Sequence, residues 1–212
     1  MVWTNTAATG ADRVLPDGCM DLIWADGMLL VAGPDTKAHL AARAVTYVGL
    51  RFPPGTAPAV FGIPAHELRD IRVPLDAVWD APEVRRATER VNRASQPGRA
   101  LEEIAAQRLR EGAPPSPVTA AVARALRAGA RVAAIADTLD LSARQLHRRS
   151  LDAFGYGPKT LARVLRMHRA LDLARAGVPL AETAFRSGYA DQSHLAREVK
   201  AFAGVPVTAL TS

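Results

Sequence analysis

Short apolar runs separated by turn residues fill the first 80 residues of the chain, a pattern typical of a small β-rich unit. Residues 19–24 and 28–31 are two such runs, and the Ala-Asp-Gly segment at 25–27 predicts a hairpin turn between them. Residues 45–52 form a third run, rich in β-branched and aromatic side chains and followed by Pro-Pro-Gly. The pattern predicts a β-rich domain over residues 1–80.

Helical patterns begin after residue 80. Residues 83–94 and 99–110 contain no internal proline or glycine, and the Pro-Gly pair at 97–98 separates them. We therefore expect a helical connector over residues 81–111. The segment Gly-Ala-Pro-Pro-Ser-Pro at 112–117 is predicted to be a linker, because three prolines in four residues cannot continue a helix.

Residues 118–212 show little strand pattern and predict a compact all-α domain. Val118, Val122 and Leu126 fall on one helical face, and Ser116 is a suitable N-cap before Pro117. The predicted fold class is therefore α+β: a small β-rich domain, linking helices, and an all-α domain with two helix-turn-helix motifs joined by a long helix. The further predicted helices are 131–138, 142–153, 159–175, 179–186 and 191–203, with a last turn near 206–210.

The helical half repeats itself. The offset between the two copies is 48 residues through the first short helix, where Ala136 matches Ala184, and 49 beyond the next turn, where Leu146 matches Leu195. Each copy consists of a short helix, a tight turn and a longer helix, which is the helix-turn-helix pattern. The leucines should point into the core, and the small alanines should let the two helices cross closely.

The segment between the copies, residues 159–175, contains no proline or glycine. A continuous helix of this length spans roughly 25 Å. Successive major grooves on one side of DNA lie about 34 Å apart. One chain could therefore address two successive turns of a duplex without a partner.

Charge divides the chain unevenly. Its formal net charge is +6. Residues 1–115 hold 13 Lys and Arg against 14 Asp and Glu, whereas residues 116–212 hold 14 against 7. A basic half beside a near-neutral half indicates a polyanion-binding module joined to another domain. A basic surface without a partner is the alternative.

The C-terminal half, over about residues 118–210, resembles the AraC/XylS family of bacterial transcription regulators. In the first copy the matching residues are Leu-Ser-Ala-Arg-Gln-Leu-His-Arg at 141–148 and Gly-Tyr-Gly-Pro at 155–158. In the second copy they are Ala-Phe-Arg-Ser-Gly-Tyr at 184–189 and Asp-Gln-Ser-His-Leu-Ala-Arg at 191–197. The resemblance implies a sequence-specific, DNA-binding transcription factor. Double-stranded DNA is its implied main partner, and RNA polymerase and a second copy of the chain are further ones.

The resemblance also implies which side chains face the bases. Arginine suits guanine O6 and N7, and glutamine suits adenine N6 and N7, so the chemistry of the implied residues agrees. These base-facing residues are Arg144, His147 and Arg148 in the first copy and Gln192, Ser193, His194 and Arg197 in the second.

Other polar residues near these faces are expected to contact phosphates, and an ordinary exposed surface role is the alternative. This second group comprises Ser142, Arg149, Lys159, Arg163 and Lys200.

The N-terminal half resembles the small cupin-like domains that precede such DNA-binding regions. The matching residues are Leu-Pro-Asp-Gly-Cys-Met-Asp-Leu-Ile at 15–23 and Gly-Leu-Arg-Phe-Pro-Pro-Gly at 49–55. Two interpretations stay open: the domain binds a small-molecule effector, or it only dimerises. Trp24, Arg51 and Trp79 are candidate ligand-lining residues, and the alternative for the two tryptophans is that they fill a small core.

Several classes of protein are disfavoured. Hydrophobic residues make up 49% of the chain, which excludes wholesale disorder, and no run of 18 apolar residues predicts a membrane span. The N-terminus does not resemble a signal peptide, so we expect a soluble cytoplasmic protein with no membrane partner. His39 and His66 lie far apart and the single Cys19 sits in an apolar run, so we expect no metal, cofactor or catalytic residue and an unreactive thiol. A cupin-type enzyme fused to a DNA-binding module is the disfavoured alternative.

Overall fold

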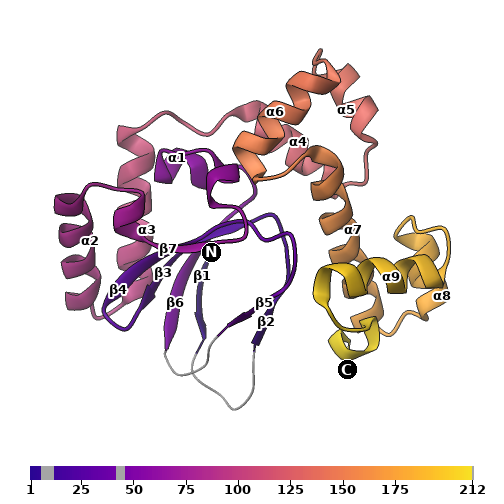
Figure 1. The fold of residues 1–212 in the computed structure, drawn as a ribbon, viewed down its shortest axis with the longest axis horizontal. Coiled ribbons are helices and arrows are strands. Elements are labelled where there is room, and N and C mark those ends of the chain that lie inside the picture. Colours follow the sequence, from indigo (N-terminus) through magenta and orange to yellow (C-terminus); the bar gives the residue numbers. More distant parts are fainter. Residues whose placement is uncertain (6–11, 42–45, 212) are drawn as a thin grey trace.

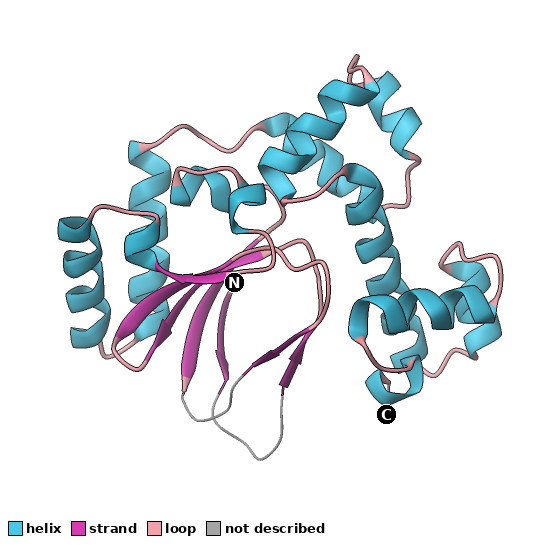
Figure 2. Cartoon of the chain, in the orientation of Figure 1, coloured by secondary structure: helices cyan, strands magenta, loops and turns pink. Residues whose placement is uncertain are grey.

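The computed structural model describes residues 1–5, 12–41 and 46–211. The fold is α+β, as predicted: an antiparallel β-sheet domain comes first and the C-terminal region is helical (Figures 1 and 2). The main sheet has five strands in the order β1-β6-β3-β4-β7, all antiparallel to their neighbours. The strands are β1 (Val2–Asn5), β3 (Met20–Ala25), β4 (Met28–Ala32), β6 (Tyr47–Phe52) and β7 (Arg72–Pro74).

Strands β3 and β4 form the predicted hairpin. Its turn uses Asp26 and Gly27, whose φ angles of 48° and 79° fit a two-residue turn that matches the twist of the strands. Leu22 on β3 lies opposite Val31 on one side and Leu50 on the other, and all three side chains are buried. The third predicted run is β6, and Val45 at the start of that run lies outside the described residues.

Helices pack with this sheet around one hydrophobic core. Figure 1 shows α2 and α3 side by side next to the sheet. Helix α3 begins at Pro97, although the sequence suggests that Pro97 and Gly98 separate two helices. Proline is tolerated in the first turn of a helix, and Gly98 is needed because a Cβ there would lie 2.4 Å from Val2 Cγ1. The helical elements here are α1 (Ala57–Phe61), η1 (Ala65–Leu68), η2 (Leu75–Ala77), α2 (Ala81–Arg93) and α3 (Pro97–Glu111).

A separate two-stranded sheet consists of β2 (Asp12–Val14) and β5 (His39–Ala41), paired antiparallel with Arg13 opposite Leu40. The apolar pattern does not predict it, because strands of three residues leave almost no periodicity to detect. In Figure 1 this small sheet extends from the main sheet toward the C-terminal helices. It therefore brings the N-terminal domain close to the second helix-turn-helix unit.

The C-terminal region contains the predicted succession of helices, each within a residue or two of its expected bounds. Ser116 occupies the N-cap of α4 without a capping hydrogen bond from its side chain. Within the described ranges, no helix combines the length and apolar character needed to cross a bilayer. The helices are α4 (Pro117–Arg127), α5 (Val132–Thr138), α6 (Ala143–Phe154), α7 (Pro158–Arg175), α8 (Leu180–Arg186), α9 (Gln192–Ala203) and η3 (Val207–Leu210).

Two hydrophobic cores divide this region, one for each copy of the repeat, and α7 contributes to both. Leu146 of α6 lies in the first core and Leu195 of α9 in the second, and both are buried as the repeat predicts. The small residues Ala136 and Ala184 are buried where the first helix of each pair meets the second. Helices α5 and α6 therefore form one helix-turn-helix unit, and helices α8 and α9 form the other.

Candidate nucleic-acid interface

The second helix of each unit, α6 or α9, has a fixed N-terminus. At α6, Ser142 and Gln145 form a capping box: the Gln145 N–H donates to Ser142 Oγ (3.2 Å), and the Ser142 N–H donates to Gln145 Oε1 (2.8 Å). At α9, the His194 N–H donates to Asp191 Oδ1 (2.6 Å). These caps fix where each helix begins and therefore which side chains occupy its first two turns.

The structure places the predicted base-facing residues on exposed parts of both helices. Arg144, His147 and Arg148 are exposed on α6, and Gln192, Ser193 and Arg197 are exposed on α9. The remaining residue, His194, is half-buried. Because the buried leucines point the other way, each helix offers a polar edge that solvent or a duplex can reach.

The two histidines are held by different contacts. His147 lies over Gly157, where a Cβ would come within 2.6 Å of the imidazole, so only glycine leaves room for this ring position. His194 meets the Tyr189 ring edge to face, with centroids 5.2 Å apart, and its Nδ1 accepts the Ala190 N–H at 3.4 Å. In the neutral His194 ring the proton therefore lies on Nε2, which is left as a donor.

A buried carboxylate anchors α9 to α7. Glu198 accepts hydrogen bonds from Arg163 Nε (2.8 Å) and Arg166 Nη2 (2.7 Å). The Arg166 guanidinium also lies 4.3 Å from the centre of the Tyr189 ring, and that of Arg163 lies 4.9 Å from the Phe202 ring. Burial alone would raise the pKa of Glu198, but the two arginines outweigh it and lower that pKa. Glu198 is therefore charged at neutral pH and fixes the rotation of α9 about its own axis.

The first unit is anchored in another way. Its counterpart of Glu198 in the repeat is Arg149, which is exposed. Instead, α6 ends against the N-terminal domain: Asp152 lies 3.4 Å from His66 Nδ1, and the Gly155 carbonyl accepts a long bond (3.4 Å) from Arg69. A Cβ on Gly155 would fall 2.3 Å from Pro34 Cγ, so the two domains approach closely here.

The residues predicted to contact phosphates divide into two groups. Arg149, Lys159 and Lys200 are exposed. Ser142 is engaged in its capping box, and Arg163 binds Glu198, an anchoring role that the sequence pattern does not predict. One feature of the sequence indicates a buried ion pair: Glu198 is the lone acidic residue on the face of α9 that also carries the buried residues Leu195, Val199 and Phe202.

The three ligand-lining candidates of the N-terminal domain do not converge on one site. Trp24 Nε1 donates to Asn92 Oδ1 on α2 (2.7 Å), and Arg51 pairs with Asp21 and Asp17. Trp79 is buried in the core, with the Arg108 guanidinium 4.7 Å from its ring centre. The core-filling alternative therefore describes Trp79 well.

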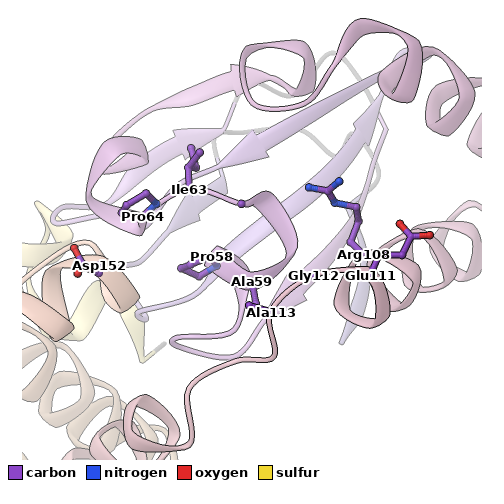
Figure 3. A pocket seen from close by; sticks show the side chains of 10 residues that line it. Pro58, Ala59, Ile63, Pro64, Arg108, Glu111, Gly112, Ala113 and Asp152 are labelled. Atoms are coloured by element: carbon purple, nitrogen blue, oxygen red, sulfur yellow. The ribbon is translucent and has the colours of Figure 1, made fainter.

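A hollow lies instead between α1, the end of α3, the linker and α6 (Figure 3). Its volume is about 480 Å³, and Pro58, Ala59 and Ile63 form its apolar wall. A second hollow of about 280 Å³ adjoins it, shares Pro58, Ala59 and Asp152, and is also lined by Arg149. The two hollows thus border both the sheet domain and α6.

Cys19 is the single cysteine of the chain. Burial raises the pKa of the half-buried Cys19 thiol, Asp17 raises it further, and the nearby Arg51 only partly offsets this, so the thiol stays protonated and unreactive at neutral pH. In the part of the chain that the structure describes, no three His, Cys, Asp or Glu side chains gather in a way that could hold a metal ion.

Paired short and long helices, capped and carrying exposed arginines, define a DNA-binding helix-turn-helix protein. Residues 135–212 match the family model described as a helix-turn-helix domain, and residues 1–74 match one described as a domain of unknown function (DUF6597). The C-terminal region is an AraC-type helix-turn-helix domain, and the chain is accordingly a DNA-binding transcriptional regulator. No curated protein matches the chain.

Similar solved structures include ToxT from Vibrio cholerae, with a TM-score of 0.52 and 11% identity over 99% of this chain and 97% of that one. ToxT from Vibrio cholerae O395 bound to (E)-4-(8-methylnaphthalen-1-yl)but-3-enoic acid gives a TM-score of 0.50 and 11% identity over 99% and 96%. The C-terminal domain of AraT, a response regulator from Geobacillus stearothermophilus, is 22% identical over 45% of this chain and 84% of that one, with a TM-score of 0.42. At these identities the likeness to ToxT concerns the fold.

Replacing Glu198 tests the anchor of α9. Glu198→Gln keeps the shape of the side chain but removes its charge, so we expect a loss of about 1–3 kcal/mol in the free energy of unfolding at pH 7. The folded-state pKa of Glu198 is depressed below its ordinary value of 4.5, so its contribution is present above that pH and fades as the pH falls through the folded pKa. Urea unfolding between pH 7 and pH 3.5 should show the two proteins converging in acid.

The matched control for this prediction is Glu182→Gln on α8, which breaks an exposed i,i+4 pair with Arg186. It should cost less than about 0.5 kcal/mol at any pH. A Glu198→Gln protein as stable as the wild type at pH 7, or a deficit undiminished in acid, would show that the buried carboxylate does not anchor α9.

Proposed function

We propose that the chain is a sequence-specific transcriptional regulator whose DNA-binding part, from residue 118 onward, inserts α6 and α9 into two successive major grooves of one duplex. The observation that carries this proposal is the pair of polar edges on α6 and α9 of two units that share α7, with the exposed Arg148 and Arg197 at equivalent positions of the repeat. Helix α7 has 18 residues, so it separates the units by roughly 27 Å along its axis. That separation is of the same order as the spacing of successive major grooves, about 34 Å.

Each edge carries the chemistry of base recognition. Arg144 and Arg148 of α6 and Arg197 of α9 present planar guanidinium groups, which pair with guanine O6 and N7. Gln192 suits adenine, and the Nε2 donor of His194 suits an acceptor such as guanine N7. The first unit should therefore prefer guanine-rich steps, and the second should read a mixed sequence.

The phosphate contacts come from the exposed charges beside these edges. Arg149 follows the α6 edge, Lys159 stands in the first turn of α7, and Lys200 lies in the last turn of α9. Arg163 contributes indirectly, because its guanidinium holds Glu198 and hence α9.

Arg148→Ala and Arg197→Ala should each cost about 1–3 kcal/mol of binding to a duplex selected from random sequence by the wild-type protein. Each variant removes a base contact, so specific binding should suffer far more than binding to a scrambled duplex of the same length. Fluorescence anisotropy with both duplexes measures this difference. Arg93→Ala on α2 removes the same charge far from the proposed surface and should change neither affinity. Equal losses on both duplexes would contradict base recognition by these arginines.

We also propose that the N-terminal domain responds to a small amphipathic effector bound in the two hollows beside α6. Pro58 and Ala59, which line both hollows, and Ile63, which lines the first, suit an apolar body, and Arg149, which lines the second, suits a carboxylate. An occupant that pairs with Arg149 would withdraw that side chain from the DNA phosphate. Effector binding would then lower the affinity for DNA.

The compound (E)-4-(8-methylnaphthalen-1-yl)but-3-enoic acid is a suitable amphipathic probe for this site. We expect it to raise the melting temperature of the wild-type protein and to weaken its DNA binding. Ala59→Trp should fill the hollow and abolish both effects, whereas Ala81→Trp, at an exposed position on α2, should leave them intact. A probe that affects Ala59→Trp as strongly as the wild type, or that affects neither protein, would exclude this site and favour dimerisation as the role of the domain.

A further inference from the structure

Residues 13–18 run alongside α7 and contact both helix-turn-helix units. Arg13 Nη1 donates to the carbonyl oxygen of Ala203, at the end of α9 (2.7 Å). Leu15 packs against the second hydrophobic core. The carbonyl oxygen of Pro16 lies 2.7 Å from His168 Nε2, in the middle of α7.

The other end of this segment reaches the first unit. A Cβ on Gly18 would lie 2.8 Å from Leu161 Cδ1 and 3.4 Å from the Tyr156 hydroxyl oxygen, and both residues belong to the first core. Gly18 also has a φ of +81°, which favours glycine. From Leu161 to His168 the axis of α7 rises about 10 Å, so the contacts of Pro16 and Gly18 lie about two helical turns apart on α7.

The neighbouring strand strengthens the hold on α9. Beside β5, the Ala38 N–H donates to the carbonyl oxygen of Phe202 (2.7 Å). The last carbonyl groups of a helix have no partner within the helix itself. Two consecutive carbonyls at the end of α9 are thus capped by the N-terminal domain, which ties the position of that end to the sheet.

Helix α7 connects the two units and contributes to both of their cores. The units have separate cores, and long helices bend and twist without breaking their hydrogen bonds. A second connection between the two units restrains the bending of α7. If α7 bent, the contacts of residues 13–18 would have to break.

We propose that residues 13–18 form a strap that fixes the orientation of α9 relative to α6, with Arg13 as a positioning residue for DNA recognition. The strap rests on the proposed function, because its purpose is to hold two recognition helices in register with two grooves. It predicts that the N-terminal domain sharpens the preference for one spacing between half-sites. The contacts of each single helix with its own half-site do not depend on the strap.

The test uses the full chain and a duplex with both half-sites, selected from random sequence by the wild-type protein. A second duplex keeps one half-site and scrambles the other, and a third contains two extra base pairs between the half-sites, which rotates them by about 70°. Arg13→Ala removes the hydrogen bond to the Ala203 carbonyl at the end of α9. Gly18→Ala places a methyl group against Leu161 and so displaces the strap. Arg85→Ala on α2 removes the same charge elsewhere, and Gly27→Ala imposes the same positive-φ strain in an open hairpin turn.

We expect Arg13→Ala and Gly18→Ala to weaken binding to the optimal duplex by about fivefold, which is the effect of losing one hydrogen bond of typical strength. Binding to the single half-site should change less than about twofold, and the penalty for two extra base pairs should shrink. Hydrogen exchange of the α9 C-terminus should quicken in Arg13→Ala without DNA. The control variants should behave as the wild type.

Two results would overturn the strap. One is equal behaviour of Arg13→Ala and Arg85→Ala on all three duplexes with unchanged exchange in α9. The other is tighter binding of Arg13→Ala to the optimal duplex, which would mean that the segment restrains DNA binding. A wild-type protein that selects no two-part site would instead contradict the proposed function, so the two failures are distinguishable.

Discussion

Helix α7 belongs to two hydrophobic cores at once, and the rest of the DNA-binding region depends on this sharing. Leu161 and Leu165 near its start are buried in the first unit, whereas Met167 and Leu171 further along are buried in the second. Because these side chains lie on one continuous backbone, neither unit can rotate about α7 without losing its own core. The direction in which each polar edge points is therefore set by packing.

In the second unit an ion pair adds to the packing of Leu195, Val199 and Phe202 in holding α9. A buried carboxylate is costly unless it is paired, so Glu198 holds α9 in the one rotation that brings it to Arg163 and Arg166. In the first unit the residue equivalent to Glu198 is an exposed arginine, and α6 instead contacts the sheet domain near η1 and at Gly155. The N-terminal domain thus contacts both recognition helices, α6 through Gly155 at its end and α9 through the last carbonyl groups of the helix.

The sequence predicts local and repeated features well. The hairpin of β3 and β4, the helix succession and the burial of Leu146 and Leu195 all follow from periodicity, turn chemistry and the internal repeat. It does not predict the short strands β2 and β5, because strands of three residues leave almost no periodicity to detect. It does not predict the role of Arg163 either, because the partner of Arg163 is 35 residues away and a basic residue near a DNA-binding face suggests a phosphate contact first.

A hydroxyl-radical and methylation-interference footprint of the wild-type protein on its selected duplex tests directly whether one chain binds two successive grooves. Two recognition helices held by one α7 predict two short protected segments on the same side of the DNA. Their centres should lie about 10 base pairs apart, with guanines important in the segment that α6 reads. A single protected segment, or two segments on opposite sides of the duplex, would contradict the account.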